Sequence, residues 1–183
     1  MIRKLRPHYY YLQYVLLHKW FVFLAGLKLG VPLGRLILHD WTKFLPREWF
    51  PYTTFFYGHG MTREAAAARD YNFPVSEAAE LAFEIAWAHH QHKNDHHWQF
   101  WVRLGDDGTT LVLPMSENAR REMLADWMGA GRALGKPDTR AWYLANRDKM
   151  QLHDETRLII EHALHVEVSW LEAVNGAVPT ASG

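Results

Sequence analysis

The stretch Leu38-His39-Asp40-Trp41-Thr42-Lys43 places an imidazole beside a carboxylate and adds an ammonium group three residues after the Asp. Neutral imidazole and carboxylate are ligands that suit zinc, iron or manganese. A lysine about one turn further on would bring a cation close to them. Taken alone, the pattern is more typical of a surface His-Asp pair with an exposed lysine. The metal-site interpretation therefore depends on where the other histidines lie.

Five of the chain's twelve histidines fall between His89 and His97. Asn94 and Asp95 interrupt the cluster, and predicted helical segments flank it, which argues against an unstructured metal-binding tract. Burial of so many polar rings without partners would be costly. Ordered ligands of a metal ion are the interpretation that explains the cluster best.

Two further candidates lie far from the cluster in sequence. His18 precedes His39 by 21 residues on a predicted helix. Asp126 shares one face of another predicted helix with Gly129 and Ala133, whose small side chains permit close approach to a neighbour. An Asp on that face needs a partner, either a cation or a basic side chain such as Arg121.

The composition narrows the class of protein. With 183 residues and 49% hydrophobic residues, the chain is predicted to form one domain over residues 1–175, with a flexible tail over residues 176–183. A net charge of zero argues against a dedicated nucleic-acid binder. The chain has no Cys, so any metal must be held by His and carboxylate.

The N-terminal region resembles a signal peptide only in part. Arg3, Lys4 and Arg6 precede an apolar stretch, but the longest purely apolar run nearby, Phe21 to Leu27, is too short to span a bilayer. We therefore expect no membrane association and a cytoplasmic location.

Apolar periodicity and capping signals predict an all-α fold. Ser76 and Ser116 are the predicted N-caps of two long helices, and Gly105-Asp106-Asp107-Gly108 predicts a single β-hairpin between Arg103 and Leu113. Thr62 is predicted to cap a short helix over residues 63–69, and whether residues 51–72 form a lid stays open. The main helices are expected over residues 7–29, 34–45, 77–91, 117–134, 138–146 and 154–174.

The order of His18, His39-Asp40, the histidine cluster and Asp126 resembles the HD-domain superfamily of metal-dependent phosphohydrolases. The closest match is His39-Asp40-Trp41-Thr42-Lys43, which looks like that superfamily's His-Asp-x-x-Lys motif. The resemblance implies an HD-domain-like helical bundle.

A narrower likeness adds three more segments, Asn94-Asp95-His96-His97-Trp98, Asp126-Trp127 and Trp142-Tyr143. With these segments the chain looks similar to a family of uncharacterised bacterial and phage proteins. That likeness brings no established activity.

The superfamily resemblance implies a set of metal ligands. One ion would be held by His18, His39, Asp40 and Asp126, and Asp40 would bridge to a second ion held by further histidines. We favour His90 and His97 for that role, with His89 and His96 as alternates.

The implied cofactor is one or two divalent ions, of Mn, Fe, Zn, Co or Mg. The implied reaction is attack of metal-activated water on a phosphomonoester. The implied partner is a small phosphorylated molecule, with a nucleotide as the first candidate; a homodimer is left open.

The resemblance also suggests roles for other polar residues. Lys43 would contact a phosphate or anchor Asp40, and Glu122 would be a general base or simply a helix-surface acid. Five arginines are candidate phosphate contacts or exposed side chains: Arg35, Arg47, Arg120, Arg121 and Arg132.

Two other functions fit the same residues. Some members of the superfamily hold two irons and activate dioxygen, so an HD-fold diiron oxygenase is the first alternative. The second is a non-catalytic protein in which a metal only staples the helices together.

Overall fold

Helices form nearly all the regular structure in the computed structural model, which describes residues 2–58 and 75–165. The predicted all-α fold with one small hairpin is confirmed. The first half contains α1 (Ile2–Lys28), α2 (Leu33–Leu38), the 3-10 helix η1 (Trp41–Phe44), α3 (Pro46–Tyr57) and α5 (Glu77–Lys93). The second half contains η2 (Trp98–Trp101), β1 (Val102–Leu104), β2 (Thr110–Val112), α6 (Glu117–Ala133), α7 (Thr139–Asn146), η3 (Arg147–Lys149) and α8 (Asp154–Ala163).

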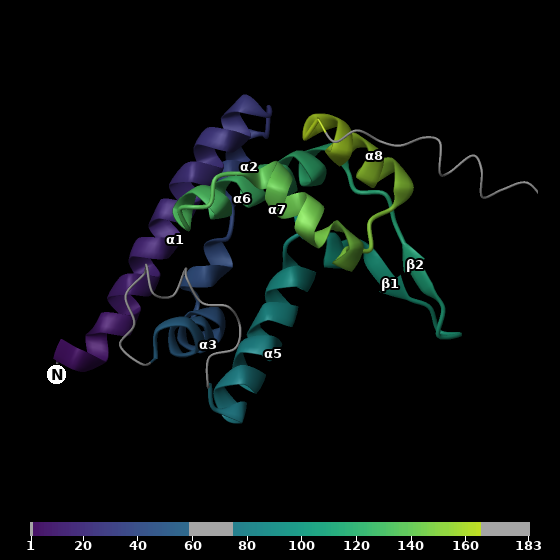
Figure 1. Cartoon of the computed structure of the whole chain (residues 1–183). Coiled ribbons are helices and arrows are strands. Elements are labelled where there is room, and N and C mark those ends of the chain that lie inside the picture. Colours follow the sequence, from purple (N-terminus) through teal and green to yellow (C-terminus); the bar gives the residue numbers. More distant parts are fainter. Residues whose placement is uncertain (1, 59–74, 166–183) are drawn as a thin grey trace, which may run out of the picture.

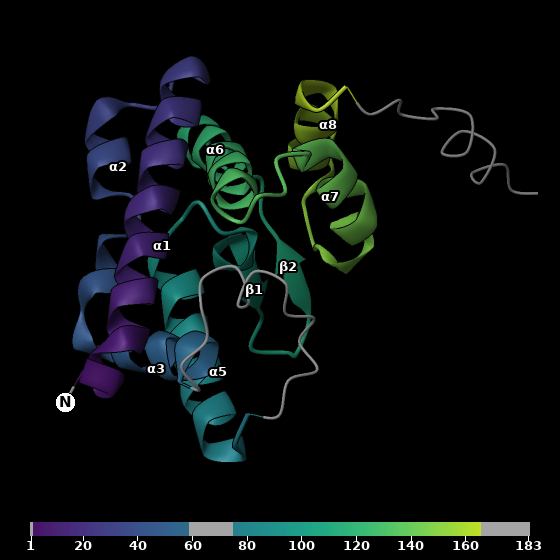
Figure 2. The same cartoon turned by 60° about the vertical axis from the view of Figure 1, so that its left-hand side comes forward.

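Helix α6, in the second half, packs against α1 of the first half. Figures 1 and 2 show it beside α1, with α7 and α8 on its other side. The close approach to α1 depends on Gly129, because a Cβ atom there would lie 2.4 Å from Cγ2 of Val22 and 2.7 Å from its backbone nitrogen. This agrees with the prediction that small residues on α6 permit close packing.

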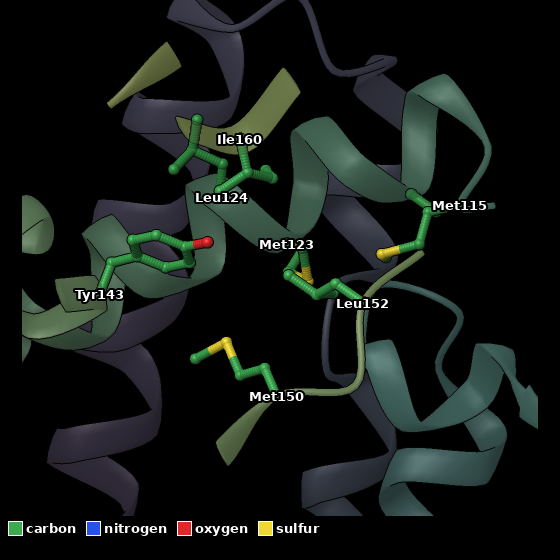
Figure 3. Packing of buried hydrophobic residues seen from close by; sticks show 8 residues of the cluster. Met115, Met123, Leu124, Tyr143, Met150, Leu152 and Ile160 are labelled. Carbon is green, nitrogen blue, oxygen red and sulfur yellow. The ribbon is translucent and has the colours of Figure 1, made fainter. Parts of the chain in front are cut away.

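Two hydrophobic clusters flank the centre of the molecule. One joins α6, α7 and α8 through residues such as Met123, Tyr143 and Ile160, whose side chains converge in Figure 3. The other joins α1, α3 and α5, and includes Tyr11 and Tyr52. The candidate metal ligands come from α1, from the ends of α2 and α5, and from α6, so helices of both clusters contribute to the site.

Local signals in the sequence located several boundaries correctly. The Ser76 side chain accepts a hydrogen bond from the backbone N–H of Ala79, and Ser116 does the same for Ala119, so both are N-caps as predicted. The hairpin is antiparallel, with Val102 opposite Val112.

Two predicted helices are too long. The helix expected over residues 34–45 ends at Leu38, because Asp40 adopts a left-handed conformation (φ 54°, ψ 25°) and the chain resumes as η1. The helix expected over residues 154–174 ends at Ala163, and His165 has a positive φ of 52°. A left-handed residue just after a helix is a common way to terminate it.

Some predictions fall on residues that are not described. The helix over residues 63–69, most of the 51–72 segment, the end of the last predicted helix and the tail over residues 176–183 lie outside the described ranges. Among the helices that are described, even the 27-residue α1 lacks the combination of length and hydrophobicity needed to cross a bilayer.

Candidate metal centre

Asp40 is the buried carboxylate around which the candidate ligands gather. Its side chain is 1% exposed, and its two oxygens face different sets of residues. Each set has potential ligand atoms within 4.8 Å of one another. We call them the His18 group (His18, His39, Asp40 and Asp126) and the His90 group (Asp40, His90, His96 and His97).

The His18 group forms around Oδ2 of Asp40. The Nε2 atom of His18 lies 3.2 Å from that oxygen and 3.1 Å from Oδ1 of Asp126. Nε2 of His39 lies 3.3 Å from Nε2 of His18 and 3.4 Å from the same Asp126 oxygen. Two imidazole nitrogens and two carboxylate oxygens thus converge from α1, from the end of α2 and from α6.

The His90 group forms around Oδ1 of Asp40, which lies 3.2 Å from Nε2 of His90 and 3.4 Å from Nε2 of His96. These three atoms and Nε2 of His97 are all buried, and none has a hydrogen-bond partner among the described residues. Buried polar atoms are nearly always satisfied, and an unsatisfied one is costly. A bound cation would satisfy all four, so the donor set fits a metal ion.

Two glutamates lie behind the candidate ligand rings. His90 donates through Nδ1 to Glu48, at 2.8 Å, and His39 donates through Nδ1 to Glu122, at 2.9 Å. Nδ1 of His96 also lies 3.3 Å from the same oxygen of Glu122. A carboxylate on one ring nitrogen favours the tautomer whose other nitrogen is free to bind a metal. Glu122 therefore supports two candidate ligands, His39 and His96, and we do not describe these three residues as a third ion site.

Basic side chains hold the end of α2 in place. Arg35 donates from Nε to Oε2 of Glu122, at 2.6 Å, and its other nitrogens contact Asp95. Lys19 donates to the backbone carbonyl oxygen of His39. These contacts fix the direction in which His39 and Asp40 leave the helix.

Lys43 is buried with its Nζ atom 2.5 Å from Oδ2 of Asp40. Burial alone would raise the pKa of Asp40, but the positive charges of His39, Lys43 and His90 hold that pKa well below its usual range. Burial would lower the pKa of Lys43, and Asp40 raises it well above its usual value. Asp40 therefore stays ionised at neutral pH, as a metal ligand must.

Burial and hydrogen bonds also have opposite effects on the pKa values of two other acids and of His96. Burial would raise the pKa of Asp126, but hydrogen bonds from His18 and His39 lower it well below its usual range. Burial would also raise the pKa of Glu122, which hydrogen bonds from His39 and His96 lower. For His96, burial would lower the pKa, but Asp40 and Glu122 raise it to about 10.

The structure brings the predicted ligands together. The six favoured residues, His18, His39, Asp40, His90, His97 and Asp126, all belong to one or both groups. His96 was expected only as an alternate to His97, yet both lie in the His90 group. His89 belongs to neither group in the described part of the chain. It lies one position before His90 and so points about 100° away around α5.

The predicted catalytic residues lie close to the two groups, but some of their contacts differ from those expected from the sequence. Glu122 is 3% exposed, so it is not a helix-surface acid, and it lies behind His39 rather than beside the Nε2 atoms. Asp126 pairs with histidines, whereas Arg121 pairs with Glu117. Arg35 is engaged with acids, and Arg120 donates to the backbone carbonyl of Met115.

Glu48 and Lys19 were missed. Glu48 is 1% exposed and shares the buried face of α3 with Tyr52, one turn later. A carboxylate on an otherwise apolar helical face is a signal that the sequence does contain. For Lys19 we find no such signal, because its contact is with a backbone carbonyl.

Comparison with known proteins gives a family and nothing about activity. Searches of the curated proteins and of the solved structures found no match. A family model described as "Family of unknown function (DUF5662)" matches residues 7–166, which include both groups. Since the match covers most of the chain, the protein belongs to the DUF5662 family.

Proposed function

We propose that the protein is a metal-dependent phosphohydrolase acting on a phosphomonoester, with a nucleotide as the first candidate substrate. The observation that carries the proposal is the position of Asp40, whose two oxygens face two separate sets of His and Asp ligands. The resemblance of His39-Asp40-Trp41-Thr42-Lys43 to the His-Asp-x-x-Lys motif supports it.

The residues of the two groups would hold one or two divalent ions. Such ions, when bound, lower the pKa of a coordinated water and polarise a phosphoryl oxygen. Asp40 would contribute to both groups, and Lys43 keeps its carboxylate ionised and oriented. Asp126 is the more exposed of the two candidate carboxylate ligands, at 14% for its side chain.

Glu122 is better suited to positioning than to proton transfer. Oε1 contacts His39 and Oε2 contacts Arg35, so both carboxylate oxygens are engaged. Its pKa is also lowered, by hydrogen bonds from His39 and His96 that outweigh burial, which makes it a weak base.

The test begins with metal content. Protein purified without a His tag is analysed for bound elements and then assayed, with the metal found, against a panel of nucleoside monophosphates and simple phosphomonoesters. We expect metal-dependent release of phosphate that Asp40→Asn abolishes. A folded protein that holds no metal, even after reconstitution, would rule out the proposal.

A dioxygen-activating enzyme with two irons is the second candidate. The two groups together offer five imidazoles and only two carboxylates, a nitrogen-rich set that suits iron. Iron with an optical spectrum that responds to oxygen would favour this reaction. Manganese, zinc or magnesium with phosphatase activity would favour hydrolysis.

The remaining alternative is a non-catalytic protein in which a metal ion only holds the helices together. It predicts that Asp40→Ala lowers the free energy of unfolding while the wild type shows no activity in either assay. The number of elements that converge on Asp40 is compatible with such a role.

A further inference from the structure

We propose that Glu122 is a positioning residue that couples the two metal groups, so that the ligands of both ions are oriented by one carboxylate. Its Oε1 atom accepts a hydrogen bond from Nδ1 of His39, in the His18 group, and lies 3.3 Å from Nδ1 of His96, in the His90 group. A carboxylate oxygen has two lone pairs and can accept from both rings. One side chain thus contacts one ligand from each group.

Glu122 is itself held rigidly. It is 3% exposed, and Arg35 donates to its other oxygen, Oε2. Arg35 also contacts Asp95, the residue just before His96. Helix α6, the end of α2 and the turn after α5 are therefore tied together at this carboxylate, and a shift of Glu122 would displace His39 and His96 together.

Glu48 provides the contrast within the same centre. It is as deeply buried, and it accepts a hydrogen bond from Nδ1 of His90 at 2.8 Å. Among the described histidines that could bind metal, Glu48 contacts His90 alone. Glu48 supports one group, whereas Glu122 supports both.

We therefore expect Glu122→Gln and Glu48→Gln to affect metal binding differently. Glu122→Gln keeps the shape of the side chain and removes its charge, so it weakens the support of a ligand in each group. Glu48→Gln makes the same chemical change but affects only the His90 group. Loss of such a supporting carboxylate typically lowers metal affinity by about 10- to 100-fold.

The experiment is a titration of metal-free protein with Co²⁺, followed by calorimetry and by the visible absorption of the bound ion. We expect two Co²⁺ per wild-type chain. Glu122→Gln should weaken both binding steps by about 10- to 100-fold, and Glu48→Gln should weaken one step. Wild-type affinity in Glu122→Gln, or a loss confined to one step, would overturn the proposal, as would a wild type that binds only one Co²⁺.

A second measurement does not depend on whether Glu122→Gln folds. In wild-type protein loaded with Zn²⁺, long-range ¹H–¹⁵N NMR correlations report which ring nitrogen of each histidine carries the proton. We expect His39 and His96 both to carry it on Nδ1. A proton on Nε2 of either ring would contradict the coupling.

The inference rests on the metal binding of the proposed function and needs an ion at both groups, but it does not depend on hydrolysis. Two Co²⁺ ions with the expected pattern of variants, but no phosphatase activity, would leave the coupling in place and remove the phosphohydrolase. A protein that binds no Co²⁺ at all would remove both.

Discussion

Nε2 of His18 lies 3.2 Å from Oδ2 of Asp40, a contact between the middle of α1 and a residue just beyond the end of α2. The two residues are 22 positions apart in the chain. The turn at residues 29–32 reverses the chain, and Val31 N–H donates to the carbonyl of Gly26 there, at 2.9 Å. Asp126 then reaches His18 from α6, because Gly129 lets that helix pack closely on α1.

Asp40→Asn is expected to remove metal binding from both groups, since it neutralises the one carboxylate they share. It also leaves the buried ammonium of Lys43 without its counter-ion, which should lower the free energy of unfolding by about 3–5 kcal/mol. Urea denaturation of metal-free protein measures this loss. The double variant Asp40→Asn with Lys43→Met should recover part of it, and no recovery would show that the pair is not coupled.

Gly129→Ala should destabilise the protein and separate α6 from α1. The added Cβ would lie 2.7 Å from the backbone nitrogen of Val22, so the helices must move apart, at a cost of about 1–3 kcal/mol. Metal affinity should fall as well, because Asp126 moves with α6. The matched control is Gly34→Ala in α2, where a Cβ meets nothing within 4 Å, and we expect it to be neutral or stabilising by up to about 1 kcal/mol.

Metal affinity should rise with pH across the neutral range. Asp40 and Glu122 raise the pKa of His96 to about 10 against the effect of burial, so a metal must displace a proton from this ring at pH 7. Calorimetry in buffers of different ionisation enthalpy measures the protons released. A pH-independent affinity between pH 6 and 9, with no proton release, would contradict the expected role of His96.

The stability of the metal-free protein should change in the opposite direction. A histidine whose pKa is raised by folding contributes stability fully below its unfolded value, about 6.5, and that contribution is lost as pH rises through the folded value, about 10. We therefore expect the free energy of unfolding of the metal-free protein to fall between pH 6.5 and 10. Urea titrations at several pH values, with EDTA present, measure this trend.

Removal of the metal should lower the melting temperature. A ligand that binds only the folded state at 100 times its dissociation constant stabilises that state by about 2.7 kcal/mol. Thermal unfolding with and without EDTA, on the wild type and on Asp40→Asn, measures the effect. The variant should show no response to EDTA, and a response equal to that of the wild type would indicate a metal site elsewhere.

The sequence predicted the parts of the fold that depend on local signals. Ser76 and Ser116 begin their helices because a side-chain oxygen caps a free backbone N–H, a preference visible in the sequence. The end of α2 was not predicted, since the left-handed turn at Asp40 is maintained by contacts with His18, Lys43 and His90. The contacts with His18 and His90 are tertiary and cannot be read from the local sequence, whereas Lys43, three residues after Asp40, was expected to lie near it.

For the candidate site too, some residues could be predicted from the sequence and others required the tertiary structure. The spacing of His18, His39-Asp40 and Asp126 matched a known pattern, and the structure brings them together. The choice between His96 and His97 could not be made from helical periodicity, because both follow the end of α5 at Lys93, where that periodicity no longer applies. The supporting role of Glu122 required knowledge of which face of α6 is turned toward His39.

The left-handed backbone at Asp40 favours glycine at a position where a metal site needs a carboxylate. A non-glycine residue in this conformation costs roughly 1–2 kcal/mol relative to one that adopts it freely. Asp40→Gly should therefore unfold at higher urea than Asp40→Ala, although both variants lack the carboxylate and leave Lys43 equally unpaired. Glycine would adopt this backbone conformation most easily, but only a residue such as aspartate can hold a cation. The chain has aspartate at this position.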